Sequence, residues 1–336
     1  MRLRIIKVGC FGGGTGLPSV LGGLKRNPWV DLNAIVTMFD SGGSSGQLRD
    51  ELGVLPPGDI LKCALTLARN EREARRVLLS RLPTLEDSRL GGHTGGNLLL
   101  SMMERYSGNF MAAVEGLSSL LGCKGRVWPV SIDQASLCAR YADGNVTKGE
   151  NQIDARQTAG QVIKDVWLEP EVSIHEQVAS AVRGLDAVVI GPGSFYTSLL
   201  PVLAVRGMAE AVADIPGPIV LVANLLTEGR GMDGFTAADE VSRIEAFIKR
   251  HVDVVVFNDG RPSAVALSRY AAEDKHPLEL GTLPGHCRVI SGTFWRRDIA
   301  RHDRLRLAHA LWAVLAGVLC EEHATSHANE ALTTHG

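Results

Sequence analysis

The chain of 336 residues is 45% hydrophobic and 21% charged, an ordinary composition for a globular protein with a sizeable core. Its formal net charge of −2 leaves no basic surplus for the phosphate backbone of a nucleic acid, so we expect no nucleic-acid partner. No apolar run approaches the roughly 20 residues that span a bilayer, and the first residues lack the apolar core of a signal peptide. We therefore expect a cytoplasmic protein without membrane insertion.

Apolar, β-branched runs alternate with segments of helical spacing, the pattern of βαβ units that build a parallel sheet. In chain order, strands are expected at residues 4–10, 32–38, 187–190, 219–223 and 252–257. Helices are expected at residues 17–25, 59–67, 71–82, 97–106 and 303–319. A less regular stretch from 126 to 168, with short alternating pieces at 127–130 and 137–141, predicts a small antiparallel excursion.

These elements predict an α/β protein with a three-layer Rossmann-like fold and a mainly parallel sheet. No internal repeat and no Pro/Ser-rich linker divides the chain, so residues 1–320 are expected to form a single nucleotide-binding domain. Residues 321–336 are polar and rich in His and Thr, which predicts a disordered tail. In such a fold the ligand binds beyond the carboxyl ends of the strands, where loops distant in sequence converge.

The first glycine-rich loop follows the first expected strand. Glycine lets the backbone turn sharply and approach an anion, and the next helix offers free N–H groups to it. The loop is not the dinucleotide fingerprint, which needs a third glycine at a fixed offset, nor a Walker loop, which needs Gly-Lys-Ser/Thr. A strand-to-helix turn needs no ligand, but the run of small residues favours phosphate binding. The candidate residues are Gly13, Gly14, Thr15 and Gly16.

The second loop begins at Asp40, where the second expected strand ends. A carboxylate at this position can bind a ribose hydroxyl or a Mg²⁺ ion. The Gly/Ser run that follows can form an anion nest, and Arg49 can clamp a phosphate. A nucleophile elbow is disfavoured because the spacing is not Gly-x-Ser-x-Gly, and a plain surface loop is the other alternative. The nest residues are Gly43, Ser44 and Ser45.

Two further turns precede expected helices. In the Leu-Pro-Pro-Gly-Asp turn, Asp59 is placed to cap the next helix and can also contact a ligand. In the Gly-Gly-His-Thr-Gly-Gly-Asn turn, His93 and Asn97 can point to one side of the helix start. A lone histidine is often only a structural hydrogen-bonding residue, so contact with a ligand and a structural role both stay open for His93.

The last loop follows the strand at 187–190. Gly193, Ser194 and Thr197 offer backbone N–H and hydroxyl groups to a phosphate. An aromatic side chain at 195 or 196 can stack on a base, although burial in the core is the usual explanation for Phe195. Asn224, at the next strand end, is a candidate contact for base or sugar. Arg301 lies in a basic cluster that either meets the ligand or forms a solvated face.

Several of these segments resemble the gluconeogenesis factor (YvcK-like) family, within the wider 2-phospho-L-lactate transferase (CofD-like) superfamily. The resemblance rests on GGGTGLPSVLGGLK, on IVTMFDSGGSSGQLRDELGVLPPGDILKC and GGHTGGNLLL, and on GPGSFYTSLLP with the late RHD. It spans residues 12–303. It implies a nucleotide-sugar ligand of the UDP-N-acetylglucosamine type and a role in central carbon metabolism, cell-wall precursor supply and cell shape. A homodimer is a family-level expectation.

Carried over by motif, the resemblance assigns the two phosphate-facing loops, the acidic strand end Asp40 and the pocket residues His93 and Asn97. It also implies that Arg301 meets the nucleotide sugar from the carboxyl-terminal side. Family members often carry a carboxylate or an amide where this chain has Ser41. A metal site would therefore depend on Asp40 alone, completed by phosphate oxygens and water.

Three functions follow from these residues. The leading one is a nucleotide-sugar-binding regulatory protein, since the anion-binding loops come without an evident catalytic base or nucleophile. The rival is a Mg²⁺-dependent phosphotransferase acting on a nucleotide diphosphate-linked donor, with Asp40 holding the ion. An NAD(P)-dependent oxidoreductase is the weakest reading, because the first loop lacks the dinucleotide fingerprint.

Overall fold

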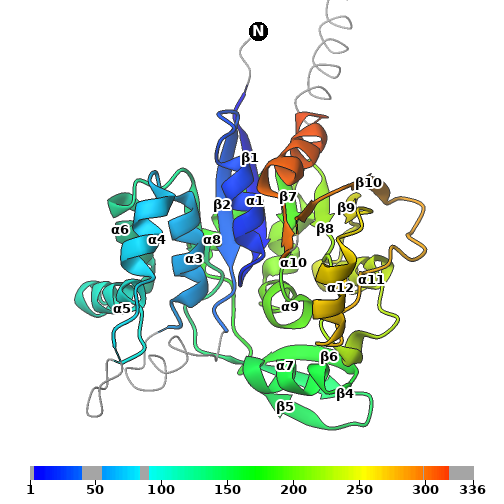
Figure 1. Cartoon of the computed structure of the whole chain (residues 1–336). Coiled ribbons are helices and arrows are strands. Elements are labelled where there is room, and N and C mark those ends of the chain that lie inside the picture. Colours follow the sequence, from blue (N-terminus) through cyan, green and yellow to red (C-terminus); the bar gives the residue numbers. More distant parts are fainter. Residues whose placement is uncertain (1–3, 40–54, 84–90, 298, 318–336) are drawn as a thin grey trace, which may run out of the picture.

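The computed structural model describes residues 4–39, 55–83, 91–297 and 299–317. Within these ranges seven strands form one sheet, which runs through the middle of the molecule in Figure 1. Every neighbouring pair in this sheet is parallel, and the strand order is β10-β9-β8-β7-β1-β2-β3. The strands are β1 (Ile6–Gly12), β2 (Val30–Val36), β3 (Arg126–Pro129), β7 (Ala187–Ile190), β8 (Ile219–Val222), β9 (Val254–Asn258) and β10 (Arg288–Gly292).

The sheet grows outward in both directions from β1. The chain adds β2 and β3 on one side, then crosses back and adds β7, β8, β9 and β10 on the other. Strand order therefore reverses between β1 and β7, and a parallel sheet of this kind opens a crevice outside the carboxyl ends of those two strands. The expected α/β, Rossmann-like fold is confirmed.

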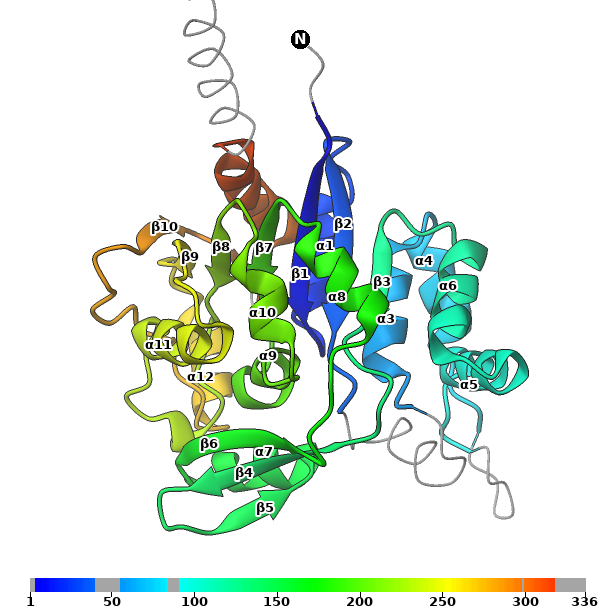
Figure 2. The same cartoon turned by 180° about the vertical axis from the view of Figure 1, so that it is seen from behind.

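Helices cover both faces of the sheet. α1 and α3 lie on the face turned to the viewer in Figure 1, and α8, α10 and α11 lie on the face shown in Figure 2. None of the helices in the described part of the chain is long and apolar enough to cross a membrane. The helices are α1 (Leu17–Leu24), α3 (Gly58–Leu67), α4 (Glu71–Leu78), α5 (Gly95–Ser107), α6 (Phe110–Leu120), α7 (Glu150–Thr158), α8 (Glu176–Arg183), α9 (Leu200–Leu203), α10 (Met208–Ala213), α11 (Ala237–Ile248), α12 (Ala264–Ala271), the π-helix η1 (Phe195–Leu199), the 3₁₀ helix η2 (Arg230–Met232) and the last helix, 304–317.

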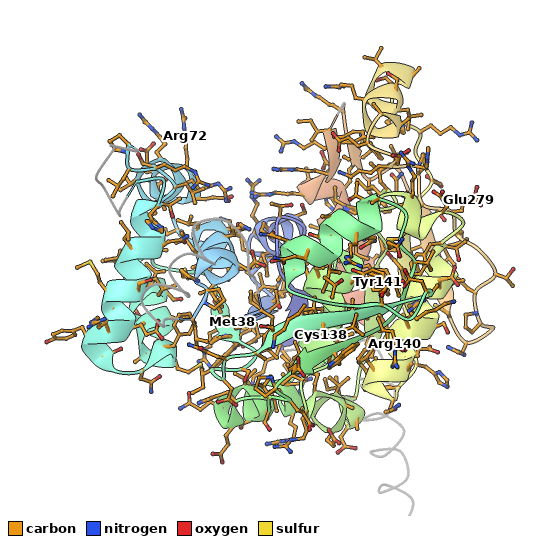
Figure 3. All side chains as sticks on the ribbon, turned by 90° about the horizontal axis from the view of Figure 1, so that it is seen from below. Met38, Arg72, Cys138, Arg140, Tyr141 and Glu279 are labelled. Atoms are coloured by element: carbon orange, nitrogen blue, oxygen red, sulfur yellow. The ribbon has the colours of Figure 1, made fainter. Side chains whose placement is uncertain are left out.

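A second, antiparallel sheet lies beyond the carboxyl ends of the main strands. It consists of β4 (Ser136–Tyr141) between β5 (Val146–Lys148) and β6 (Ile163–Glu169), with α7 packed beside it. Figure 2 shows this layer below the main sheet, and Figure 3 views the molecule from that side, with Cys138, Arg140 and Tyr141 marking β4. The predicted antiparallel excursion is thus confirmed for residues 137–141.

The placement of residues 127–130 in the same excursion is wrong. Residues 127–129 of this piece belong to β3, which pairs in parallel with β2 at the edge of the main sheet. The strand is short and ends at Pro129, whose missing N–H an edge strand tolerates. Only Val127 and Pro129 of its four residues are buried. This alternation of buried and more exposed residues is also typical of an antiparallel strand, so the sequence pattern did not distinguish the two.

The last helix packs closely on α1. A side chain at Gly23 would bring a Cβ atom to 2.3 Å from the backbone oxygen of Arg304, so the two helices approach this closely only because position 23 is glycine. The guanidinium of Arg304 donates to Glu71 at 2.9 Å, and Lys25 donates to the same carboxylate at 3.1 Å. These contacts fix the carboxyl-terminal helix, and with it the strand that precedes it, against the first βα unit.

Candidate functional site

A cavity of about 680 Å³ opens where the strand order reverses. Its walls include the loops after β1, β7 and β8, helix α7 and strand β12 (Ile299–His302), which forms a hairpin with β11 (Trp295–Arg296). Small-molecule sites typically measure about 300–1,000 Å³. The cavity therefore has the size and position expected of a ligand site in this fold.

The two glycine-rich loops touch each other at the floor of the cavity. A Cβ atom on Gly16 would lie 2.3 Å from the backbone oxygen of Pro192, so a side chain there would push the loops apart. Gly14 adopts φ +62°, the left-handed region that glycine enters without penalty. The convergence of the first and last loops, predicted from their strand ends, is present in the structure.

A carboxylate from another element holds the first loop. Asp59 on α3 accepts a hydrogen bond from the backbone N–H of Gly14, and its other oxygen accepts from Lys62 at 2.8 Å. The expectation that Asp59 caps α3 is wrong, because the helix begins at Gly58 without any side-chain cap. Among the described residues, the N–H groups of Thr15 and Gly16 have no hydrogen-bond partner, and α1 also lacks a side-chain cap.

A second carboxylate holds the loop after β7. Glu228 accepts hydrogen bonds from the backbone N–H of Phe195 at 3.0 Å and from the hydroxyl of Ser194 at 3.1 Å. Asn224 joins the same loop: its side chain donates to the backbone oxygen of Gly193 at 2.9 Å and accepts from its N–H at 3.3 Å. Two hydroxyl groups in this loop, those of Ser194 and Thr197, lie 2.6 Å apart.

The electrostatic environment of Glu228 is unusual. The pKa of this carboxyl is raised to about 7, mainly by burial and also by the charge of Asp154, while the hydrogen bonds from Phe195 and Ser194 act in the opposite direction. Beneath it lies Glu240, which is fully buried and whose pKa burial raises well above its ordinary value. Glu228 therefore changes its charge near neutral pH while it faces the cavity.

The hairpin that carries Arg301 is anchored by a small apolar cluster. Trp295 packs with Leu225 and Leu226 from the loop after β8, and Tyr270 packs against them. The hydroxyl of Tyr270 accepts a hydrogen bond from the backbone N–H of Ala300 at 2.8 Å. This anchoring brings β12, and with it Arg301, to the wall of the cavity.

His302, the next residue of β12, is almost fully buried beside the cavity. Burial lowers its pKa to about 4, against a contact with the backbone of Ala223 that acts in the opposite direction. The ring is therefore neutral at physiological pH, so the cation that this strand presents to the cavity is Arg301.

The structure brings together many of the residues predicted for the site. Those that line the cavity are Gly14, Thr15, Gly16, Gly193, Ser194, Thr197, Asn224 and Arg301. Gly13 lies just behind them, where a Cβ would meet Thr37 and Asp59. Asp40, Gly43, Ser44, Ser45 and Arg49 lie outside the described residues.

His93 and Asn97 are not among the residues that line this cavity. Both are buried at the start of α5, where the hydroxyl of Thr94 caps the helix by accepting from the backbone N–H of Asn97 at 3.2 Å. The aromatic residues proposed to stack on a base are buried too: Phe195 and Tyr196 pack against Phe235 in the core. An aromatic residue that does line the cavity is Tyr270.

Sequence reasoning missed the charged residues that complete the walls: Glu150, Asp154, Glu228 and Lys275. Glu228 has one signal in the sequence, its place four residues after Asn224 in a loop that follows a strand. The residues of α7 have no such signal, because they reach the site only through the small antiparallel sheet.

The family model described as 2-phospho-L-lactate transferase CofD matches residues 8–295. The gluconeogenesis factor of Bacillus subtilis is 34% identical over 315 residues, which cover 91% of this chain and 96% of that protein. The gluconeogenesis factor of Listeria innocua is also 34% identical, over 92% of this chain and 95% of the relative. The chain belongs to the CofD-like gluconeogenesis factor family.

A solved structure of this family agrees with the fold. The crystal structure of a UPF0052 family protein from Bacillus halodurans superposes with a TM-score of 0.83 at 34% identity, over 92% of this chain and 99% of that one. The resemblance expected from the glycine-rich motifs of this gluconeogenesis factor family member is thereby confirmed, as is its three-layer α/β architecture.

Proposed function

We propose that this protein binds a nucleoside diphosphate-linked sugar of the UDP-N-acetylglucosamine type in the cavity between β1 and β7. In this proposal it acts as a cytoplasmic regulatory protein linked to central carbon metabolism, cell-wall precursor supply and cell shape. The observation that carries the proposal is the convergence of two glycine-rich loops and Arg301 on one cavity. Backbone N–H groups at helix starts and a guanidinium are the groups that proteins use to bind phosphates.

The distribution of charge supports a ligand that is anionic in one part only. The N–H groups of Thr15 and Gly16 and the cations Arg301 and Lys275 supply the electropositive groups of the cavity. Asp154 and Glu150 on α7 supply carboxylates, which accept hydrogen bonds from hydroxyl groups. A diphosphate joined to a polyhydroxylated sugar matches this combination, whereas a ligand with phosphates at both ends would meet repulsion.

Isothermal titration with UDP-N-acetylglucosamine tests the proposal, with UDP and free N-acetylglucosamine titrated separately to divide the contributions. Arg301→Ala is expected to weaken binding by about 10- to 100-fold, because a charge-assisted hydrogen bond contributes about 1.5–3 kcal/mol. The matched control is Arg183→Ala, at the exposed end of α8 and far from the cavity. Absence of any heat of binding with wild type at high micromolar UDP-N-acetylglucosamine would refute the proposal. Equal affinity of Arg301→Ala and Arg183→Ala for this ligand would refute it as well.

The alternative is a phosphotransferase of the 2-phospho-L-lactate transferase type, acting on a nucleotide diphosphate-linked donor. Two observations favour it: the match of the CofD family model, and a carboxyl group, Glu228, whose pKa of about 7 suits a general base. Glu150 and Asp154 offer carboxylate oxygens, the donors that Mg²⁺ prefers, so the described residues fit such an ion. When bound, Mg²⁺ would neutralise charge on the phosphates; Asp40, the carboxylate expected to hold it, lies outside the described residues.

Transfer of the phospho group to a deazaflavin acceptor, followed by chromatography, distinguishes the two functions. Turnover that disappears in Asp40→Asn and in Glu228→Gln, with donor binding retained, would establish the transferase. Donor binding without any turnover would leave the regulatory function as the explanation.

A further inference from the structure

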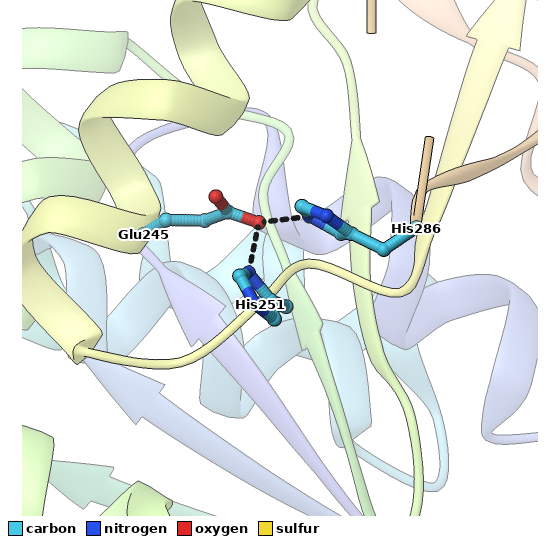
Figure 4. A group of neighbouring side chains, drawn as sticks. All are labelled: Glu245, His251 and His286. Carbon is cyan, nitrogen blue, oxygen red and sulfur yellow. Dashed lines mark hydrogen bonds and ion pairs between the residues drawn. The ribbon is translucent and has the colours of Figure 1, made fainter. Parts of the chain in front are cut away.

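Two histidines and a glutamate meet at the end of the sheet opposite to the cavity. Glu245 lies in the last turn of α11, His251 in the connection that leads to β9, and His286 in the turn just before β10 (Figure 4). One oxygen of the Glu245 carboxylate lies 2.8 Å from Nε2 of His286 and 3.4 Å from Nδ1 of His251. One ligand atom from each of the three residues lies within 4.8 Å of the other two.

These separations match the edges of a metal coordination sphere. Zinc binds imidazole nitrogen and carboxylate oxygen at about 2.0–2.2 Å, so two ligands of a tetrahedral site stand about 3.3 Å apart. The two oxygen–nitrogen separations at Glu245, 2.8 Å and 3.4 Å, lie on either side of that value. Small rotations of the two exposed imidazoles would therefore bring all three atoms into range of a single ion.

The carboxylate is fixed in place before any ion arrives. The backbone N–H of Val252 donates to Glu245 at 2.8 Å, which anchors the oxygen that both histidines approach. The acceptor oxygen is therefore held at the position where the two imidazoles converge.

The two imidazoles lie against each other. Their ring centroids lie 3.9 Å apart with the planes tilted by 34°, and one nitrogen of each ring approaches the same carboxylate oxygen. The three side chains therefore form one compact group of nitrogen and oxygen donors, the donor types that zinc binds.

We propose that Glu245, His251 and His286 bind one divalent transition-metal ion, zinc in the first place, with water completing its coordination. Imidazole ligands suit zinc, copper and nickel, whereas Mg²⁺ prefers oxygen ligands only. Three protein ligands are one fewer than closed structural zinc sites carry, so the ion keeps an open position toward solvent. The ion would tie α11 to the amino ends of β9 and β10, and β10 is one of the two edge strands of the main sheet.

Titration of the metal-stripped full chain with Co²⁺, followed by visible absorption, and with Zn²⁺, followed by calorimetry, tests this site. We expect one ion per chain and a rise in the thermal unfolding temperature on binding. Loss of an outer-shell partner already costs about 10- to 100-fold in metal affinity, so Glu245→Gln and His286→Gln should each exceed that loss. His251→Gln should weaken binding as well. Because 69% of the His251 side chain is exposed, this variant should fold normally.

Controls separate this site from other possible donors. Cys287→Ser removes the thiol next to His286, which does not belong to the Glu245, His251 and His286 group, so affinity should not change. His309→Gln, on the exposed side of the last helix, and a triple Gln variant of the histidines at 323, 327 and 335 should also bind normally. Equal Zn²⁺ affinity in wild type and His286→Gln, or loss of binding in the triple variant, would overturn the proposal. Because the cluster lies away from the cavity, nucleotide-sugar binding should be the same in all these variants.

Discussion

Replacing Glu228 by Gln should change how the stability of the protein depends on pH. Burial raises the folded-state pKa of this carboxyl from an ordinary 4.5 to about 7, so folding favours its protonated form. The resulting stabilisation is fully present below pH 4.5 and is lost as pH rises through 7. Gln keeps the size of the side chain and its acceptor oxygen for the N–H of Phe195, but it cannot ionise.

The size of the effect follows from the two pKa values. Each unit of difference corresponds to about 1.36 kcal/mol, so a shift of about 2.5 units makes the wild type lose about 3 kcal/mol relative to Glu228→Gln between pH 4.5 and 8. The comparison is a difference between two proteins, so groups that titrate identically in both cancel.

Urea unfolding of both proteins at half-unit steps from pH 4.5 to 8.5 measures this difference directly. Asp154→Asn provides an internal check, because removing that neighbouring charge should lower the pKa of Glu228 and shift the transition to lower pH. A difference in unfolding free energy that stays flat across this range would refute the reasoning, since it would mean that Glu228 is ionised normally in the folded state.

Three further predictions concern the loops and the buried histidine. Gly16→Ala should abolish nucleotide-sugar binding and lower the unfolding temperature, because its Cβ would lie 2.3 Å from a backbone oxygen; Gly285→Ala, with open space around it, should do neither in calorimetry. Asp59→Asn should reduce the free energy of unfolding by about 1.5–3 kcal/mol, the contribution of a hydrogen bond to a charged group, as measured in urea. The ring signals of His302 should stay unchanged in NMR spectra between pH 5.5 and 8, because its pKa lies at about 4.

The central strands could be predicted from the sequence because a parallel strand covered on both faces is a continuous apolar run. Residues 187–190 form β7 as expected, and β1 and β2 are displaced by only two residues. The edge strand β10 has no such run, since its residues are exposed or half-buried. The other edge strand, β3, was placed in the antiparallel excursion instead. Sequence patterns therefore identified the middle of the sheet and missed both of its edges.

The helix predicted at 71–82 shows a different limit. It ends at Leu78, and the chain then turns so that Leu82 and His93 pair through their backbones. No glycine or proline directly follows Leu78 to mark the end of the helix. The helical spacing of the apolar residues therefore predicted a helix that is too long. The N-cap of the following helix, Thr94, was likewise hidden between two glycine pairs.

The phosphate loops could be predicted for a related reason. Glycines after a strand indicate a sharp turn of the local backbone, and a sequence pattern predicts local conformation best. The roles of Asp59 and Glu228 are not local, because their partners Gly14 and Phe195 stand 45 and 33 residues away. For Asp59 the local sequence pattern predicted the wrong role. An acidic residue after Pro-Gly also matches the pattern of a helix N-cap, so the sequence predicted a cap on α3 rather than a hydrogen bond to Gly14.

These two carboxylates explain how the loops are kept in shape, and they restrict where a ligand can bind. Each occupies a backbone N–H that an anion would otherwise take: Asp59 that of Gly14, and Glu228 that of Phe195. A diphosphate is therefore left with the N–H groups of Thr15 and Gly16 on one side and with Arg301 on the other. Because Glu228 borders this space and titrates near pH 7, an anion bound there would favour its protonated form, so binding should take up a proton and weaken above neutral pH.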